Sequence, residues 1–287
     1  MNYTRRDFTK VALVALPAAA ISLHSAAFAA PNSRIGGVQI GATTYSFKQD
    51  VRKPAEIIPD LVKIGLSSVE LMSDDAELME GFGPSVKLED GQRKRRDRRG
   101  KTSALKHQRV RKMFDDAGIN LDILCYNMGP NITDDEIDYA FRMAQAMKVG
   151  AISSSSTVAV ARRIAPLADR YKILWGGHGH TAVNDPNEFA TLESFELIMS
   201  LSNYIAVNLD IGHYTAANYD PIPFIQKHHA RITNLHLKDR KKNNGPIVPW
   251  GQGDTPIKEV LQLMVRRSTR SQPTSNWSIQ FRKARIR

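Results

Sequence analysis

Two short segments of this chain end an apolar run with carboxylate and imidazole groups. Residues 208–213 read NLDIGH, and residues 234–239 read NLHLKD. Apolar runs of this length are typical of buried parallel strands, and polar side chains at the carboxyl ends of such strands form the active sites of α/β barrels. We therefore expect two adjacent strands to bring Asp210, His213 and His236 into one pocket.

Carboxylate oxygen and imidazole nitrogen together suit a divalent metal such as Mn, Zn, Co or Fe, whereas Ca prefers oxygen alone. The two segments thus predict a metal-dependent enzyme with Asp210 and His236 among the ligands. Each residue also has a structural alternative. Asp210 could cap a helix that follows its strand, and His236 could be a core histidine with satisfied hydrogen bonds.

The alternation of strand-like runs with helical patterns predicts the scaffold that positions these residues. Seven strand-then-helix units can be read, which implies parallel strands with right-handed crossovers and an α/β fold of the (β/α)8 TIM-barrel type. The predicted strands are 38–45, 67–71, 119–126, 151–155, 172–176 and the two runs that carry Asp210 and His236. The predicted helices are 54–64, 106–117, 133–148, 158–170, 186–201, 221–228 and 255–264.

The barrel pattern stops after Met264. Residues 276–281 form at best a weak strand before a basic end, so we expect the last strand of the barrel to be doubtful or missing. A missing strand would leave the first and seventh strands as open edges, at a cost beyond the ~5–15 kcal/mol that keeps a domain folded. The predicted organisation is a barrel over 31–264 followed by an aberrant basic tail over 265–287.

The first 30 residues have the features of an export signal. The pair Arg5-Arg6 precedes an apolar run over 11–23 and a small-residue site at 27–29, which is typical of a twin-arginine signal peptide. A membrane anchor or a chance arginine pair is the alternative. The apolar run is shorter than the ~20 residues that span a bilayer, and Pro17 interrupts it. We expect a periplasmic or secreted protein without a stable membrane anchor.

The net charge of +11 raises nucleic acid as a partner, but its distribution argues against one. Much of the excess lies at 93–101 and in the last two dozen residues, without a nucleic-acid-binding module. We interpret the first cluster as a solvated or disordered loop. Cys125 is the only cysteine, which excludes an intrachain disulfide and favours a packed strand residue. The oligomeric state stays open, and a homo-oligomer is compatible with the sequence.

Three segments resemble the xylose isomerase-like TIM-barrel proteins called sugar phosphate isomerases/epimerases. They are 208–217, 231–242 and 249–256, and the resemblance extends over 38–264. It implies a divalent metal at the barrel mouth that polarises a sugar carbonyl or hydroxyl, while acidic side chains move protons at the adjacent carbon. Some relatives instead cleave 3-keto-glycosides by elimination. In this resemblance Asp210 and His236 match metal ligands, and His213 matches a histidine beside the metal or the substrate.

Two family positions differ in this chain. On strand five the usual glutamate is absent, and residues 175–180 read WGGHGH. His178 is therefore the candidate ligand, and His180 beside it is a candidate to orient His178. The glutamate of strand eight has no counterpart after Met264. Suitable codons for the residues from Ser275 onward, when translated in a shifted reading frame, encode Gln-Leu-Glu-Tyr-Ser-Val-Pro-Glu. This peptide resembles the final strand of the family. We hypothesise a frameshift just past Met264; chance agreement is the alternative.

Four further residues are candidates for the pocket. Glu70 ends a strand and could be a catalytic acid/base or a partner of the arginine-rich stretch. Lys238 and Asp239 could form an ion pair or contact the substrate. Trp250 could stack on a sugar ring or pack within its loop.

The sequence therefore predicts a metal-dependent sugar isomerase/epimerase that transfers a proton next to a sugar carbonyl. A 3-keto-glycoside lyase in the same pocket and a catalytically inactive sugar-binding barrel are the alternatives. The predicted catalytic residues are Glu70, His213 and Lys238; the substrate-binding residues are His180, Asp239 and Trp250; the metal ligands are His178, Asp210 and His236.

Overall fold

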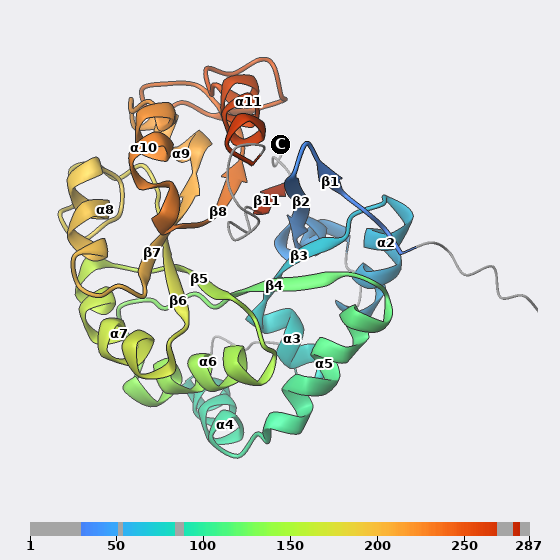
Figure 1. The fold of residues 1–287 in the computed structure, drawn as a ribbon. Coiled ribbons are helices and arrows are strands. Elements are labelled where there is room, and N and C mark those ends of the chain that lie inside the picture. Colours follow the sequence, from blue (N-terminus) through green and yellow to red (C-terminus); the bar gives the residue numbers. More distant parts are fainter. Residues whose placement is uncertain (1–29, 51–53, 84–88, 269–277, 282–287) are drawn as a thin grey trace, which may run out of the picture.

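The computed structural model describes residues 30–50, 54–83, 89–268 and 278–281 (Figure 1). Eight parallel strands form a curled sheet, in which β2 pairs with both β3 and β11 and thereby joins the two ends. The α/β barrel predicted from the sequence is confirmed. The parallel strands are β2 (Val38–Thr43), β3 (Ser68–Met72), β4 (Asn120–Cys125), β5 (Ala151–Ser155), β6 (Leu174–His178), β7 (Ile205–Asp210), β8 (Ile232–Leu237) and β11 (Ser278–Phe281).

Helices surround this sheet (Figure 1). They are α2 (Ile57–Lys63), α3 (Ser73–Met79), α4 (Glu89–Gly100), α5 (Ala104–Asp116), α6 (Asp134–Ala146), α7 (Val158–Tyr171), α8 (Leu192–Met199), α9 (Ile211–Ala216), α10 (Pro221–His228) and α11 (Ile257–Ser268). Short elements complete the chain: β1 (Arg34–Ile35), β9 (Asp239–Arg240), β10 (Ile247–Val248), η1 (Thr44–Asp50), η2 (Pro54–Glu56) and η3 (His229–Arg231). Within the described residues no helix is long and apolar enough to cross a membrane.

Local sequence signals explain where several helices begin. The Thr133 hydroxyl accepts the Glu136 N–H at 3.3 Å, and the Glu136 carboxylate accepts the Thr133 N–H at 3.2 Å, so the predicted capping box opens α6. Asp220 accepts the Ile222 N–H at 2.9 Å, with proline in the first turn of α10. Helix α8 begins later than the sequence predicted because its capping residue is Thr191.

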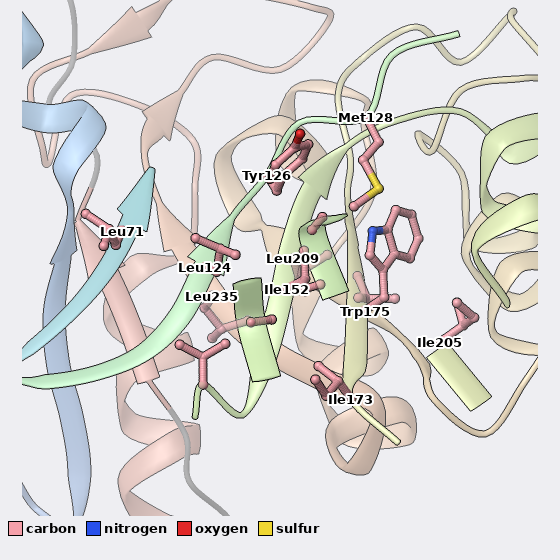
Figure 2. Close-up of a cluster of buried hydrophobic side chains, with 14 of the residues drawn as sticks. Leu71, Leu124, Tyr126, Met128, Ile152, Ile173, Trp175, Ile205, Leu209 and Leu235 are labelled. Atoms are coloured by element: carbon pink, nitrogen blue, oxygen red, sulfur yellow. The ribbon is translucent and has the colours of Figure 1, made fainter. Parts of the chain in front are cut away.

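The core lies between the strands and the surrounding helices. Figure 2 shows Leu124, Ile152, Leu209 and Leu235 from four strands converging on one cluster, and each is at most 1% exposed. Burying one such side chain stabilises the fold by roughly 1.5–3 kcal/mol, which explains why the strands read as continuous apolar runs. The Cys125 side chain is buried in β4, as predicted.

The eighth strand position is occupied. Residues 278–281 form β11, whose register places Ile279 level with Leu235 of β8 and with Ile40 of β2. The expectation of a missing strand with two open edges is therefore wrong for this structure. Parallel pairing uses backbone N–H and C=O groups, which almost any residue supplies. The four residues of β11 therefore form hydrogen bonds with the edges of β2 and β8 without the glutamate expected on the last strand.

The arginine-rich stretch is a helix, which contradicts the predicted solvated loop. In α4 both Arg95 and Arg99 form ion pairs with Glu77 of α3, whose side chain is fully buried. Arg99 also contacts Glu136 at the start of α6, with Nη1 and Oε1 3.0 Å apart. The ion pairs could not be predicted from the arginine cluster alone, because their buried partner Glu77 lies outside it and no sequence pattern marks Glu77 as that partner.

Candidate active site

The carboxyl ends of β6, β7 and β8 bring the predicted site residues together. Strand register pairs Asp210 with His236, and it pairs His178 with Asn208. The ring centroids of His178 and His236 lie 4.8 Å apart. Adjacent parallel strands thus place the aspartate and the two histidines at one edge of the sheet, as barrel geometry requires.

His178, Asp210 and His213 form a group that could hold a metal ion. Each offers one ligand atom, and these atoms lie within 4.8 Å of one another. His213 reaches the site because α9 begins directly after β7 and Asp210 caps it, with Oδ1 accepting the His213 N–H at 2.9 Å. Asp210 therefore combines the capping role with a position in the site, since its second oxygen faces away from the cap.

The surroundings of His178 fit a metal ligand. The side chain is buried, and neither ring nitrogen has a hydrogen-bond partner among the described residues. Burial lowers the pKa of His178 well below its ordinary value, and the neighbouring His236 and Lys238 act in the same direction. A neutral imidazole with a free lone pair, next to a carboxylate, matches the donor set of Zn, Mn, Fe or Co.

Lys238 lies inside this group. Its ammonium donates to Oδ2 of Asp210, and Nζ is 2.9 Å from Nε2 of His213. Burial acts to raise the pKa of Asp210, but the positive charges that His213 and Lys238 can carry outweigh burial and leave it well below its ordinary value. Burial lowers the pKa of His213 to about 3 despite the nearby carboxylate. An ammonium thus occupies the oxygen that a metal would bind.

Glu70 and His236 form a second buried contact beside the first group. Oε2 of Glu70 lies 2.5 Å from Nε2 of His236, and the Ser153 hydroxyl donates to Oε1. Glu70 is fully buried and pairs with His236, whereas Glu77 is the carboxylate that pairs with the arginine-rich helix. The sequence missed Ser153 because a run of serines without a motif gives no sign of which one faces the barrel interior.

His180 lies at the rim of the site. Its Nδ1 is 3.2 Å from Oε2 of Glu188, and its Nε2 is 3.4 Å from Oγ of Ser155. The His180 ring meets His178 edge to face, at a centroid distance of 5.2 Å. These hydrogen bonds hold His180 itself, and they do not orient His178.

Asp239 organises the loop that follows β10. Its Oδ2 accepts the backbone N–H groups of Gly251 and Gly253, each at 2.8 Å. A side chain at position 253 would collide with this carboxylate, since a Cβ would lie 1.8 Å from Oδ1. Trp250 is 48% exposed on the same loop. Lys238 and Asp239 therefore have different partners, and the surface ion pair considered for them is not what the structure shows.

Arg240 is a site residue that sequence reasoning missed. Its Nη1 lies 2.6 Å from Nδ1 of His213, on the side of the ring opposite Lys238. The segment 234–239 ends just before Arg240, so the contact is visible only in the folded structure.

Two cavities lie in this part of the barrel. A small one of about 30 Å³ touches His178, Asn208 and His236, and has room for about one water-sized group. A larger one of about 330 Å³ lies next to it, and both are lined by Met72 and Asn127.

No family model matches the sequence, and no curated protein matches it either. Solved structures match the fold. A probable 3-DHS dehydratase, AsbF from Bacillus anthracis, aligns with 85% of this chain and 92% of its own at 15% identity and a TM-score of 0.61. A sugar phosphate isomerase/epimerase from Parabacteroides distasonis ATCC 8503 aligns with 88% of this chain and 92% of its own at 17% identity and a TM-score of 0.58.

A third similar structure is the IOLI protein with a bound zinc atom, which aligns with 85% of this chain and 88% of its own at 11% identity and a TM-score of 0.60. At these identities the likeness shows the fold. The chain is an α/β barrel of the kind found in these proteins.

Proposed function

We propose that this protein is a metal-dependent enzyme that moves a proton next to the carbonyl of a small-molecule sugar, as an isomerase or epimerase. The observation that carries the proposal is the buried contact between Glu70 and His236 beside the group of His178, Asp210 and His213. The sugar phosphate isomerase/epimerase with the same fold supports the substrate class.

His178, Asp210 and His236 would hold the divalent metal, and His213 would lie beside it; Nδ1 of His236 has no hydrogen-bond partner among the described residues. The two unpartnered ring nitrogens of His178 and the N/O donor set support this assignment, as does the zinc bound by the IOLI protein. Mn, Zn, Co or Fe would suit these donors. When bound, such an ion supplies Lewis-acid polarisation of a carbonyl or hydroxyl oxygen.

Glu70 is the proposed proton carrier. A carboxylate within hydrogen-bond distance of an imidazole can take a proton from carbon and share it with the ring, provided that both lie beside the substrate. Ser153 fixes the other carboxylate oxygen, so the orientation of Glu70 is set before substrate arrives.

Lys238 has two tasks in this proposal. In the metal-free protein its ammonium neutralises the buried Asp210 carboxylate. With substrate present, the same ammonium can stabilise negative charge that develops on a sugar oxygen. His213, held between Lys238 and Arg240, can pass a proton at the opposite side of the pocket. His180 and Trp250 at the rim and Asp239 beneath its loop are the proposed contributors to substrate binding.

Two alternative functions would use the same pocket. The dehydratase with the same fold supports an elimination, and a 3-keto-glycoside lyase would follow this course. The ammonium on Asp210 favours a metal-free, catalytically inactive sugar-binding barrel, because a resident cation already neutralises the carboxylate.

Incubation with sugars and 3-keto-glycosides in D₂O, with added Mn²⁺ or Zn²⁺, separates the three candidates. The proposed isomerase gives a rearranged sugar with an intact carbon skeleton, and deuterium appears at the carbon next to the carbonyl. Release of an aglycone identifies the lyase. Sugar binding without exchange or products, in the presence of metal, contradicts both enzymes.

We further propose export by the twin-arginine pathway and a shifted reading frame past Met264. The arginine pair at positions 5 and 6 supports the export proposal, and the basic sequence after residue 264 supports the shifted reading frame. Replacing both arginines with lysine should keep the precursor inside the cell. Resequencing the gene tests the second proposal, and an intact frame without a glutamate-bearing alternative contradicts it.

A further inference from the structure

The cavity of about 330 Å³ lies outside the group of histidines and has no role in the proton transfer described above. It is bounded by the beginning of α3, by α4 and by the loop between β4 and α6. Figure 1 shows α4 beside α6 on the outer side of the barrel. The charged residues in its lining are Asp74, Arg96, Arg99 and Glu136.

These charges are balanced: Arg96 and Arg99 both pair with Glu136, and Asp74 pairs with Arg95 outside the lining. Nη1 of Arg99 lies 3.0 Å from Oε1 of Glu136, and Nε of Arg96 lies 3.3 Å from Oε2 of the same carboxylate. Two guanidinium groups facing two carboxylates do not favour an anion such as phosphate. They offer donors and acceptors side by side, which is the pattern that sugar hydroxyls need because each hydroxyl both donates and accepts.

Tyr126 adds an unexplained polar group to this lining. Its side chain is 3% exposed, and its hydroxyl has no hydrogen-bond partner among the described residues. The Arg99 guanidinium lies over the Tyr126 ring, with Cζ 5.3 Å from the ring centroid. Figure 2 shows the hydroxyl pointing away from Leu124 and the core cluster. Buried polar groups are nearly always hydrogen-bonded, so an unpaired one beside a polar cavity points to a ligand.

The cavity is continuous in its lining with the candidate active site. Met72 and Asn127 line both this cavity and the small one that touches His178 and His236. A ligand held at the histidines therefore passes these two side chains to reach the larger cavity. The small cavity alone, at about 30 Å³, is far below the size of a typical small-molecule site of about 300–1,000 Å³.

We infer that the larger cavity is a subsite for a second polyhydroxylated ring, so that the ligand of this protein is of disaccharide size. The inference rests on the proposed function in one respect, that the first ring of the ligand is a sugar. Arg96, Glu136 and Asp74 bind the hydroxyls of the second ring, and Tyr126 supplies an aromatic edge and a hydroxyl.

Gly129 offers a clean way to fill this cavity. It lines the cavity, and a Cβ built there meets no atom within 4 Å. Its φ lies outside the left-handed region, so Gly129→Phe introduces a ring without backbone strain. Gly100→Phe is the matched control, because Gly100 also has open space around it but does not line the cavity. Arg96→Ala removes one polar partner whose side chain is 43% exposed.

The test measures the binding of maltose, cellobiose and lactose against glucose and galactose by calorimetry. Wild-type protein and the Gly100→Phe control should bind at least one disaccharide about tenfold more tightly than its monosaccharides, as one or two additional hydrogen bonds would give. Gly129→Phe should abolish this preference without changing monosaccharide binding, and Arg96→Ala should reduce it.

Equal affinity for disaccharides and monosaccharides, or a preference that survives Gly129→Phe, overturns the subsite. The proposed function is then untouched, because monosaccharide binding remains. If wild-type protein binds none of the five sugars, both the subsite and the sugar specificity of the proposed function are overturned.

Discussion

Glu70 and His236 lie 166 positions apart in the sequence, yet their side chains meet in the barrel interior at 2.5 Å. Glu70 lies in the middle of the second barrel strand and His236 lies near the end of the seventh, so neither segment alone reveals the contact. It joins a candidate acid/base to a candidate ligand, and in the proposed function it would link proton transfer to the metal site.

Glu70→Gln tests this contact. The amide retains the size of the side chain but cannot take a proton, so we expect a loss of ~10²–10⁴-fold in deuterium exchange into the substrate. The free energy of unfolding should fall by only about 1–3 kcal/mol, because one charged hydrogen-bond acceptor is lost. Glu188→Gln at the rim is the control and should retain exchange. Full exchange in Glu70→Gln would remove this residue from the chemistry.

Lys238→Met tests the competition for Asp210. Removing the ammonium leaves a buried carboxylate without its partner, so the metal-free protein should lose about 3–5 kcal/mol of stability. Added Zn²⁺ should restore stability in the variant and bind more tightly than in the wild type. Urea unfolding with and without Zn²⁺ measures both effects. A variant that Zn²⁺ fails to stabilise contradicts a metal role for Asp210.

His213 should make the metal-free protein sensitive to acid. Burial lowers its pKa to about 3 in the folded state, whereas the unfolded chain binds the proton near the ordinary value of 6.5. The unfolded state therefore holds more protons between these values. The contribution of His213 to the free energy of unfolding is fully present above about pH 6.5. It decreases by up to about 1.4 kcal/mol per pH unit as the pH falls from there toward 3. His213→Gln should flatten this slope in urea titrations run with a chelator, and an unchanged slope would show that His213 is protonated in the fold.

Glu77→Ala should be strongly destabilising although the residue lies outside the candidate active site. Its loss leaves Arg95 and Arg99 without their shared buried carboxylate, for which we expect about 3–5 kcal/mol. Asp115→Ala removes an exposed pair with Arg111 one helical turn away and should change stability by less than about 1 kcal/mol. Similar unfolding midpoints for the two variants would contradict the structural role of α4.

The strands and most helices could be predicted from the sequence because their signals are local. Ala151–Ser155 and Pro221–His228 match the predicted bounds. Gly150 ends the helical pattern before the first, and an N-cap with proline fixes the start of the second. Helix α4 and strand β11 could not be predicted in this way. The arginines of α4 depend on Glu77, and β11 is held by the open edges of β2 and β8.

Some residues of the candidate active site could also be predicted from the sequence, and others could not. Asp210 and His236 could be predicted because each follows an apolar run directly. The positions of Lys238, Arg240 and Ser153 depend on strand register and on side chains from distant segments, which sequence spacing does not encode.

Metal analysis of the purified protein tests the central claim most directly. The account predicts about one equivalent of Mn, Fe, Co or Zn in wild-type protein and in His228→Ala, whose histidine bonds Glu196 outside the site. His178→Ala and Asp210→Asn should each lose the metal while remaining folded by circular dichroism. Unchanged metal content in these two variants, or no metal uptake by folded wild-type protein at excess Zn²⁺ and Mn²⁺, would contradict it.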